Sequence, residues 1–129
     1  MKFLFDSNPL IYFLNGALPP QGQNLIRQGM RFGAAFSVIS RIEILGYEGT
    51  PQQGSAAVRL LAQLTEIDLT EAIVNQTIQL RRQYRRLKLP DAIIAATAME
   101  YALPLITHNL SDFTCVAGLI CHDPFSGGA

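Results

Sequence analysis

Four acidic residues stand beside the expected ends of strands and helices, where side chains from distant segments can meet. They are Asp6, Glu43, Asp91 and Asp112. Carboxylates gathered at one site repel one another and need a cation, and hard oxygen ligands without histidine suit Mg²⁺ or Mn²⁺. One or two such ions can activate a water and offset the charge on a phosphodiester during cleavage. The pattern therefore favours metal-dependent hydrolysis of phosphodiesters.

A basic cluster leads directly into Asp91. It contains five of the ten basic residues of the chain within eight positions, namely Arg81, Arg82, Arg85, Arg86 and Lys88. On one continuous helix these side chains fall in two adjacent rows, so we expect a single broad basic face. Such a face could guide an RNA backbone toward the metal or bind the acidic tail of a partner protein. It could also be an ordinary solvated face, because basic residues suit a helix C-terminus.

The elements that must position these residues alternate between short apolar strands and helices. Strands are predicted near residues 2–6, 34–39, 66–69, 104–107 and 119–121, and helices near 10–14, 20–30, 41–47, 52–64, 71–86 and 90–99. Strands separated by helices pair in parallel through crossover connections. We therefore expect an α/β fold, a three-layer α/β/α sandwich with a central parallel sheet.

Topology brings three of the carboxylates to one edge of that sheet. Asp6 ends the first strand, Asp112 follows the fourth, and Glu43 begins a helix that leaves the second, so all three reach the carboxyl edge where ligands bind. Asp91 lies in the first turn of the helix at 90–99. Because a crossover helix runs antiparallel to the next strand, we expect Asp91 near the opposite edge unless the helix is tilted. Topology alone therefore leaves Asp91 unassigned.

Each carboxylate also has a purely structural interpretation. Asp6 could cap a helix or turn, and Glu43 could be the return arm of a capping box that starts at Ser40. Asp91 could be a first-turn acid favoured by the helix dipole, and Asp112 could form an Asx turn. For each residue taken alone the structural interpretation is the stronger, and only the surrounding sequence favours a shared site.

Composition restricts the class of protein. The chain has 129 residues, 49% of them hydrophobic and 16% charged, so we expect one domain over 1–125 and a flexible tail at 126–129. Ten basic residues balance ten acidic ones, which argues against nucleic-acid binding through bulk positive charge. No apolar run approaches the ~20 residues needed to cross a bilayer, so we expect a cytoplasmic protein without a membrane segment. Cys115 and Cys121 are expected to be free thiols, and their spacing does not favour zinc.

Four segments together resemble one known family. They are FLFDSNPLIY at 3–12, SRIEILGY at 40–47, LPDAIIAATA at 89–98 and LITHNLSDF at 105–113. In their order and their span over nearly the whole chain they resemble PIN domains, and within that family the VapC-type toxin ribonucleases of toxin–antitoxin systems. The resemblance implies a PIN-like α/β/α fold with a central parallel sheet. It also implies an acidic quartet at the four positions named above, and thereby brings Asp91 to the site.

We predict distinct roles for the four acids at such a site. Asp6, Asp91 and Asp112 would hold Mg²⁺ or Mn²⁺, directly or through water. Glu43 would bind the metal or orient the attacking water.

Three neutral residues would support the same site. Asn8 would steady Asp6, and Thr107 would donate a hydrogen bond near the cluster. Asn109 stands where some family members carry a further aspartate, so it is an alternative to Asp112 for completing the site.

The function implied by the resemblance is hydrolysis of RNA phosphodiester bonds by the toxin of a type II toxin–antitoxin pair. A small antitoxin that blocks the site and a homodimer are implied with it. The alternative is a PIN-fold module that has lost catalysis and binds only protein or RNA. A phosphate-transfer domain with Asp6 as nucleophile is poorly supported, because the sequence Asp6-Ser7-Asn8 lacks the second aspartate usual in one such family.

Overall fold

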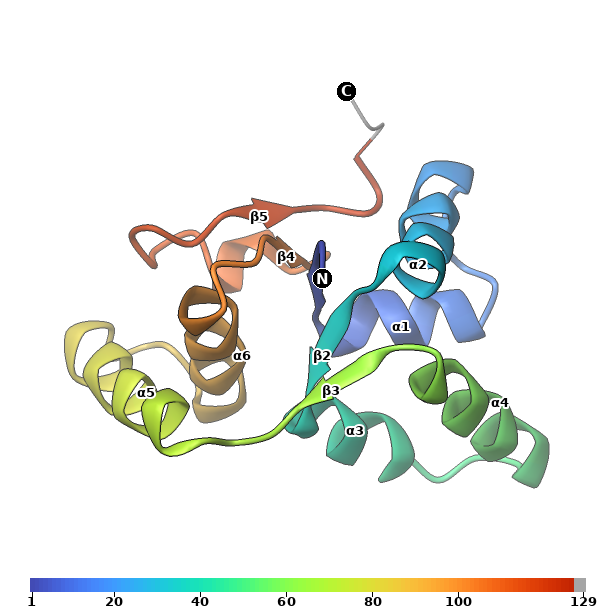
Figure 1. The fold of residues 1–129 in the computed structure, drawn as a ribbon, viewed down its shortest axis with the longest axis horizontal. Helices are drawn as coiled ribbons and strands as arrows, with labels where there is room; N and C mark the ends of the chain where they lie inside the picture. The colour runs from blue at the N-terminus through green and yellow to red at the C-terminus, as the bar shows by residue number, and fades with distance from the viewer. Residues whose placement is uncertain (127–129) are drawn as a thin grey trace.

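The computed structural model describes residues 1–126, which contain a five-stranded sheet and six α-helices (Figure 1). In chain order the elements are β1 (Leu4–Phe5), α1 (Ser7–Leu14), α2 (Pro20–Phe32), β2 (Ala35–Ser37), α3 (Val38–Leu45), α4 (Pro51–Ala62), β3 (Thr65–Ile67), α5 (Glu71–Gln83), α6 (Leu89–Glu100), β4 (Leu105–Ile106), the 3₁₀ turn η1 (Leu110–Asp112) and β5 (Cys121–His122). Apart from Ser126, the tail expected at 126–129 lies outside the described residues.

The sheet has the strand order β3-β2-β1-β4-β5, and every neighbouring pair is parallel. The first strand is therefore central, with Leu4 opposite Ala35 on one side and Leu105 on the other. Because all five strands run the same way, their carboxyl ends share one edge of the sheet. Each side chain that follows a strand emerges at that edge.

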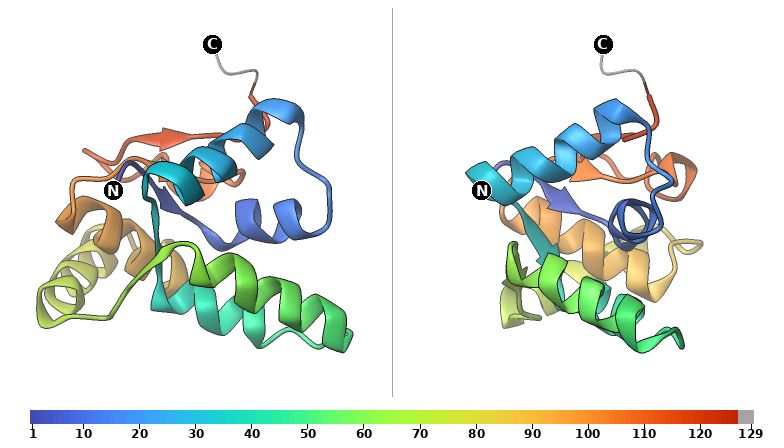
Figure 2. Two further views of the ribbon diagram at one scale, coloured as in Figure 1. Left: turned by 45° about the vertical axis from the view of Figure 1, so that its right-hand side comes forward. Right: turned by 90° about the vertical axis from the view of Figure 1, so that its right-hand side faces the viewer.

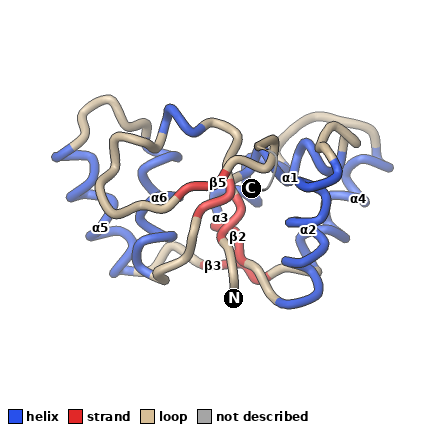
Figure 3. The backbone as a smooth tube through the Cα atoms, turned by 90° about the horizontal axis from the view of Figure 1, so that it is seen from above, coloured by secondary structure: helices blue, strands red, loops and turns tan. Residues whose placement is uncertain are grey.

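Helices cover both faces of the sheet (Figure 3). Leu4 and Leu105 are fully buried against α5 and α6, whereas Phe5 and Ile106, the next residue in each strand, pack against α1, α2 and α4. Successive side chains of a strand point to opposite faces, so even a two-residue strand contributes to both cores. The predicted three-layer α/β/α sandwich is thus confirmed. Two further views show α3 and α4 side by side beyond the end of β2 (Figure 2).

The third helix begins three residues earlier than the sequence predicted. Its N-cap is Ser37, whose Oγ accepts a hydrogen bond from the Ile39 N–H at 3.1 Å. The prediction failed because Val38 and Ile39 are β-branched and therefore resemble strand residues. Ser40 lies inside the helix and is fully buried, so the capping box expected between Ser40 and Glu43 is wrong.

The fifth helix ends at Gln83, three residues before the predicted end at Arg86. Tyr84 leaves the helical conformation, and the chain turns so that Leu87 is buried. The single basic helix face is therefore wrong, because only Arg81 and its neighbour Arg82 belong to the helix. The basic residues in the following loop are Arg85, Arg86 and Lys88.

Other local predictions are confirmed. Thr70 caps α5 through a bond from the Ile73 N–H to Thr70 Oγ1, and Pro90 stands in the first turn of α6. Cys115 and Cys121 are both free. Within residues 1–126, no helix has the length and apolar character that a membrane span would require.

The packing between α2 and β1 generates a stability prediction. Gly29→Ala is expected to destabilise the protein by about 1–2 kcal/mol. The new Cβ would lie 2.8 Å from a Phe5 ring carbon and from the Ala34 Cβ, which outweighs the helix preference for alanine. Gly54→Ala in α4 meets no atom within 4 Å and is expected to stabilise by about 0.5–1 kcal/mol. Urea unfolding of both variants checks these two expectations. Changes of the same sign in the free energy of unfolding would contradict them.

Candidate active site

Asp6 occupies the centre of the carboxyl edge, directly after β1. It is 6% exposed, and its Oδ1 accepts a hydrogen bond from the Ser7 N–H at 2.8 Å. Its Oδ2 accepts one from Thr107 Oγ1 at 2.8 Å and a longer one from Asn8 Nδ2 at 3.4 Å. The capping interpretation is therefore correct, since Asp6 is the N-cap of α1. The cap uses Oδ1 while Oδ2 faces other groups, so Asp6 can cap the helix and still serve a site.

The neutral residues expected near Asp6 are in contact with it or with one another. The Asn8 side chain accepts a hydrogen bond from the His108 N–H at 3.1 Å, which orients its amide toward Asp6. Thr107 is fully buried, and its Oγ1 accepts from the Asn109 N–H at 3.1 Å while donating to Asp6. The contacts fit the support predicted for Asn8 and Thr107, and Asn109 joins the site through its backbone.

Glu43 reaches the same edge from α3. Its Oε1 accepts a hydrogen bond from Ser7 Oγ at 2.7 Å, and the same Ser7 oxygen lies 2.9 Å from Ser40 Oγ. Neither serine was predicted from the sequence to be part of the site. The available signal was their spacing, since Ser7 follows Asp6 directly and Ser40 precedes Glu43 by one helical turn.

Asp91 lies in the first turn of α6, at the same edge as Asp6. Its pKa rises from the ordinary 3.8 to about 6, mainly through burial and then through the negative charges of Asp6, Asp112 and Glu43. The expected position near the opposite edge is wrong. A crossover helix that runs antiparallel to the next strand starts at the carboxyl edge and ends where that strand begins, so its first turn belongs to the site.

Asp6 and Asp112 complete the set of four acids. Burial raises the pKa of Asp6, the hydrogen bonds from Thr107 and Ser7 lower it, and the charges of Glu43 and Asp112 raise it again, with a net increase. Asp112 itself is exposed and ends the turn η1. The fold therefore places all four acids close enough for each to disfavour the charge of another.

The donor set fits a hard divalent cation that keeps part of its water shell. Within residues 1–126, no three acidic, histidine or cysteine side chains are close enough together to enclose an ion. Mg²⁺ is commonly bound through one or two carboxylates, several waters and the phosphate of a substrate, so it needs no complete protein cage. The oxygen-only set of Asp6, Asp91 and Asp112 suits Mg²⁺ or Mn²⁺ on these grounds.

A cleft of about 400 Å³ opens beside two of the acids. Asp91 and Asp112 line it together with Arg85, Arg86 and Lys88. The basic residues of the α5–α6 loop therefore lie next to the acids even though they do not form a helix face. Opposite charges that border one cleft can bind a phosphate chain and an associated cation together.

The α5–α6 loop is fixed at two points. Arg81 Nη1 donates to the Leu87 carbonyl at 2.7 Å, and Tyr84 Oη accepts from the Ala117 N–H at 3.0 Å. Arg81 thus supports the loop rather than lining the cleft. Arg82 is exposed on α5 and does not line the cleft either.

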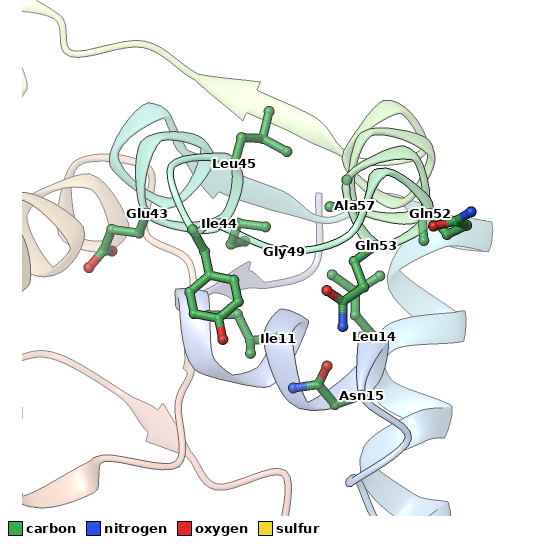
Figure 4. Close-up of a pocket in the computed structure, with 13 residues that line it drawn as sticks. Ile11, Leu14, Asn15, Glu43, Ile44, Leu45, Gly49, Gln52, Gln53 and Ala57 are labelled. Atoms are coloured by element: carbon green, nitrogen blue, oxygen red, sulfur yellow. The ribbon is translucent and has the colours of Figure 1, made fainter.

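A second, larger groove of about 650 Å³ lies between α1, α3 and α4 (Figure 4). Its lining is mostly apolar and includes Ile11, Leu14, Ile44 and Ala57. Glu43 stands at one end, with its carboxylate pointing away from these residues. This groove was not predictable from the sequence, because its walls come from three separate helices.

Comparisons with known proteins agree with this architecture. The family model described as PIN domain matches residues 3–119. A chain of a toxin–antitoxin complex from Klebsiella pneumoniae is 31% identical, with a TM-score of 0.76 over 95% of this chain and 98% of that chain. No curated protein sequence gives a significant match.

Two further solved structures are similar in fold alone. A chain of the DNA-bound VapBC from Salmonella typhimurium has a TM-score of 0.84 at 22% identity, and covers 96% of this chain and 98% of that chain. A chain of VapBC2 from Rickettsia felis, bound to a DNA fragment from its promoter, has a TM-score of 0.81 at 20% identity, over 95% and 98%.

The raised pKa of Asp91 predicts a pH-dependent effect on stability. The folded carboxyl binds its proton more tightly than the unfolded one, so stability falls as pH rises from 3.8 to about 6 and stays reduced above that. Asp91→Asn removes this penalty. In EDTA it should raise the unfolding free energy at pH 7.5 by about 1 kcal/mol, a value discounted for solvent screening.

Thermal melts at pH 7.5 and pH 4 check this expectation, with Asp68→Asn at an exposed acid as the control. The gain should shrink to a small part of its pH 7.5 value at pH 4, where Asp91 is protonated in the folded state and partly protonated in the unfolded one. An equal gain at both pH values would show that the charge of Asp91 is not the cause.

Proposed function

The chain belongs to the PIN domain family, and on that basis we propose that it is a Mg²⁺- or Mn²⁺-dependent endoribonuclease, the toxin of a type II toxin–antitoxin pair. The observation that carries the proposal is the convergence of four acids at the carboxyl edge, where the charges of Asp6, Glu43 and Asp112 all raise the pKa of Asp91. Repulsion among these acids is destabilising without a cation. In a nuclease site the acids would bind a divalent cation, which would offset the repulsion.

Each acid takes a distinct part in this proposal. Asp6, Asp91 and Asp112 would hold the ion, and Glu43 would bind it or orient the attacking water. When bound, Mg²⁺ or Mn²⁺ would offset the negative charge of the phosphate and favour ionisation of a water. The hydrogen bonds from Thr107 and Ser7 keep Asp6 in place and lower its proton affinity, so that it is available as a ligand.

The RNA strand would pass through the cleft between the acids and the α5–α6 loop. Arg85, Arg86 and Lys88 would contact its phosphates there, beside Asp91 and Asp112. Formal net charge is zero over the chain, so binding would depend on this local concentration of positive charge.

A small antitoxin is the proposed protein partner. Support comes from the 31% identical chain, which belongs to a toxin–antitoxin complex. The apolar groove between α1, α3 and α4 suits an amphipathic segment of such a partner, and a basic residue at its end could reach Glu43. The homodimer that the family resemblance implies remains a prediction.

A binding module without catalysis is the second candidate. One observation favours it, namely that no three acids within residues 1–126 form a ready enclosure for an ion. Such a module would bind RNA or protein unchanged after loss of all four carboxylates.

Cleavage of a mixed RNA pool by the purified protein tests the proposal. We expect cleavage with Mg²⁺ or Mn²⁺, none with EDTA, and a loss of at least ~100-fold in Asp6→Asn and Asp91→Asn, because the ion would lose a ligand. Asp68→Asn, at an exposed acid outside the site, should cleave like the parent. Folded protein that binds Mn²⁺ and RNA but does not cleave would favour the binding module instead.

The loop cations generate a separate prediction. Arg85→Ala combined with Arg86→Ala should raise KM for an RNA oligonucleotide about tenfold with little change in kcat, because phosphate contacts are lost while the acids stay. The salt dependence of RNA binding should also weaken. Arg27→Ala, at an exposed arginine of α2, serves as the matched control. An unchanged KM in the double variant would place the RNA elsewhere.

A further inference from the structure

Two serines join the Asp6 end of α1 to the Glu43 face of α3. Ser7 is 7% exposed and Ser40 is fully buried, so neither hydroxyl is free to bond with bulk water. Ser7 Oγ lies 2.7 Å from Glu43 Oε1 and 2.9 Å from Ser40 Oγ. These contacts bridge segments that are 33 and 36 residues apart in the chain.

The number of protons available fixes the direction of these two hydrogen bonds. A hydroxyl carries one proton, whereas a carboxylate can only accept. Ser7 must therefore donate its proton to Glu43, and the contact between the serines then requires Ser40 to donate to Ser7. A hydrogen bond to a charged acceptor is the stronger kind, and donation from Ser40 polarises the Ser7 hydroxyl toward Glu43.

Glu43 needs such a contact because repulsion acts on it. Its charge and that of Asp6 disfavour each other, and the residue as a whole is exposed. A glutamate side chain rotates freely about three bonds when nothing holds it. Within residues 1–126, Ser7 provides the one side-chain hydrogen bond to Glu43.

Ser7 also fixes the second carboxylate. Its N–H donates to Asp6 Oδ1 at 2.8 Å while its Oγ binds Glu43. The backbone and the side chain of Ser7 thus contact two acids, one that caps α1 and one within α3.

From these contacts we propose that Ser7 and Ser40 are positioning residues that hold Glu43 in its working orientation toward Asp6. The inference rests on the proposed function, in which Glu43 acts on the water or the ion. It adds two neutral side chains, Ser7 and Ser40, whose hydroxyls act on the reaction by positioning Glu43.

Kinetics of Ser7→Ala, Ser40→Ala and Glu43→Gln test the proposal. We expect Ser7→Ala to lower kcat about tenfold or more with KM within about twofold, because a displaced catalytic group costs rate rather than substrate binding. Ser40→Ala should lower kcat less. In the Glu43→Gln background, Ser7→Ala should cost little more, since its effect already passes through Glu43. Losses that multiply in the double variant would overturn the proposal.

A readout without catalysis separates this inference from the proposed function. Three-bond NMR couplings report the χ1 rotamer of Glu43 in the metal-free protein. We expect one rotamer in the parent and averaging in Ser7→Ala and Ser40→Ala. Ser37→Ala removes the α3 cap without touching Glu43, so it should lower thermal stability and leave the rotamer fixed. An unchanged rotamer in folded Ser7→Ala would refute the inference, whereas a parent that cleaves no RNA would refute only the proposed function.

Discussion

Repulsion among acids at one edge of the sheet is the constraint on which the rest of this structure depends. The surrounding residues reduce its cost in different ways. Thr107 and the Ser7 N–H donate hydrogen bonds to Asp6, which lower its proton affinity against the effect of burial. Lys88 lowers the proton affinity of Asp91 through its positive charge. Hydrogen bonds and one nearby lysine thus offset part of the repulsion, although not every acid is paired with a positive charge.

The sheet makes this concentration of charge possible. The central strand β1 has two residues, and both are fully buried, one against each helical layer. A shift of one residue would turn Leu4 and Phe5 toward the wrong layers and move Asp6 from the edge. The apolar packing on the two faces therefore fixes the position of the acid that follows, and the stability of the core is coupled to the geometry of the site.

The sequence was sufficient where local chemistry decides the structure and insufficient where distant contacts do. Alternation of apolar strands with helices predicted the sandwich, and Thr70 predicted the start of α5. The end of α5 depends on burial of Leu87 and on the Arg81 contact, which no local pattern reveals. Topology was taken to leave Asp91 near the opposite edge, although an antiparallel crossover helix starts at the carboxyl edge and so places its first turn there. Ser7 and Ser40 meet across 33 residues, so only the folded chain shows their link.

The hydrogen bond between Tyr84 and the Ala117 backbone has a consequence for substrate entry. It ties the loop before Asp91, which lines the cleft, to the segment after Asp112. An RNA strand bound there as proposed would meet a loop that is already held in place, so the loop would lose little conformational freedom on binding.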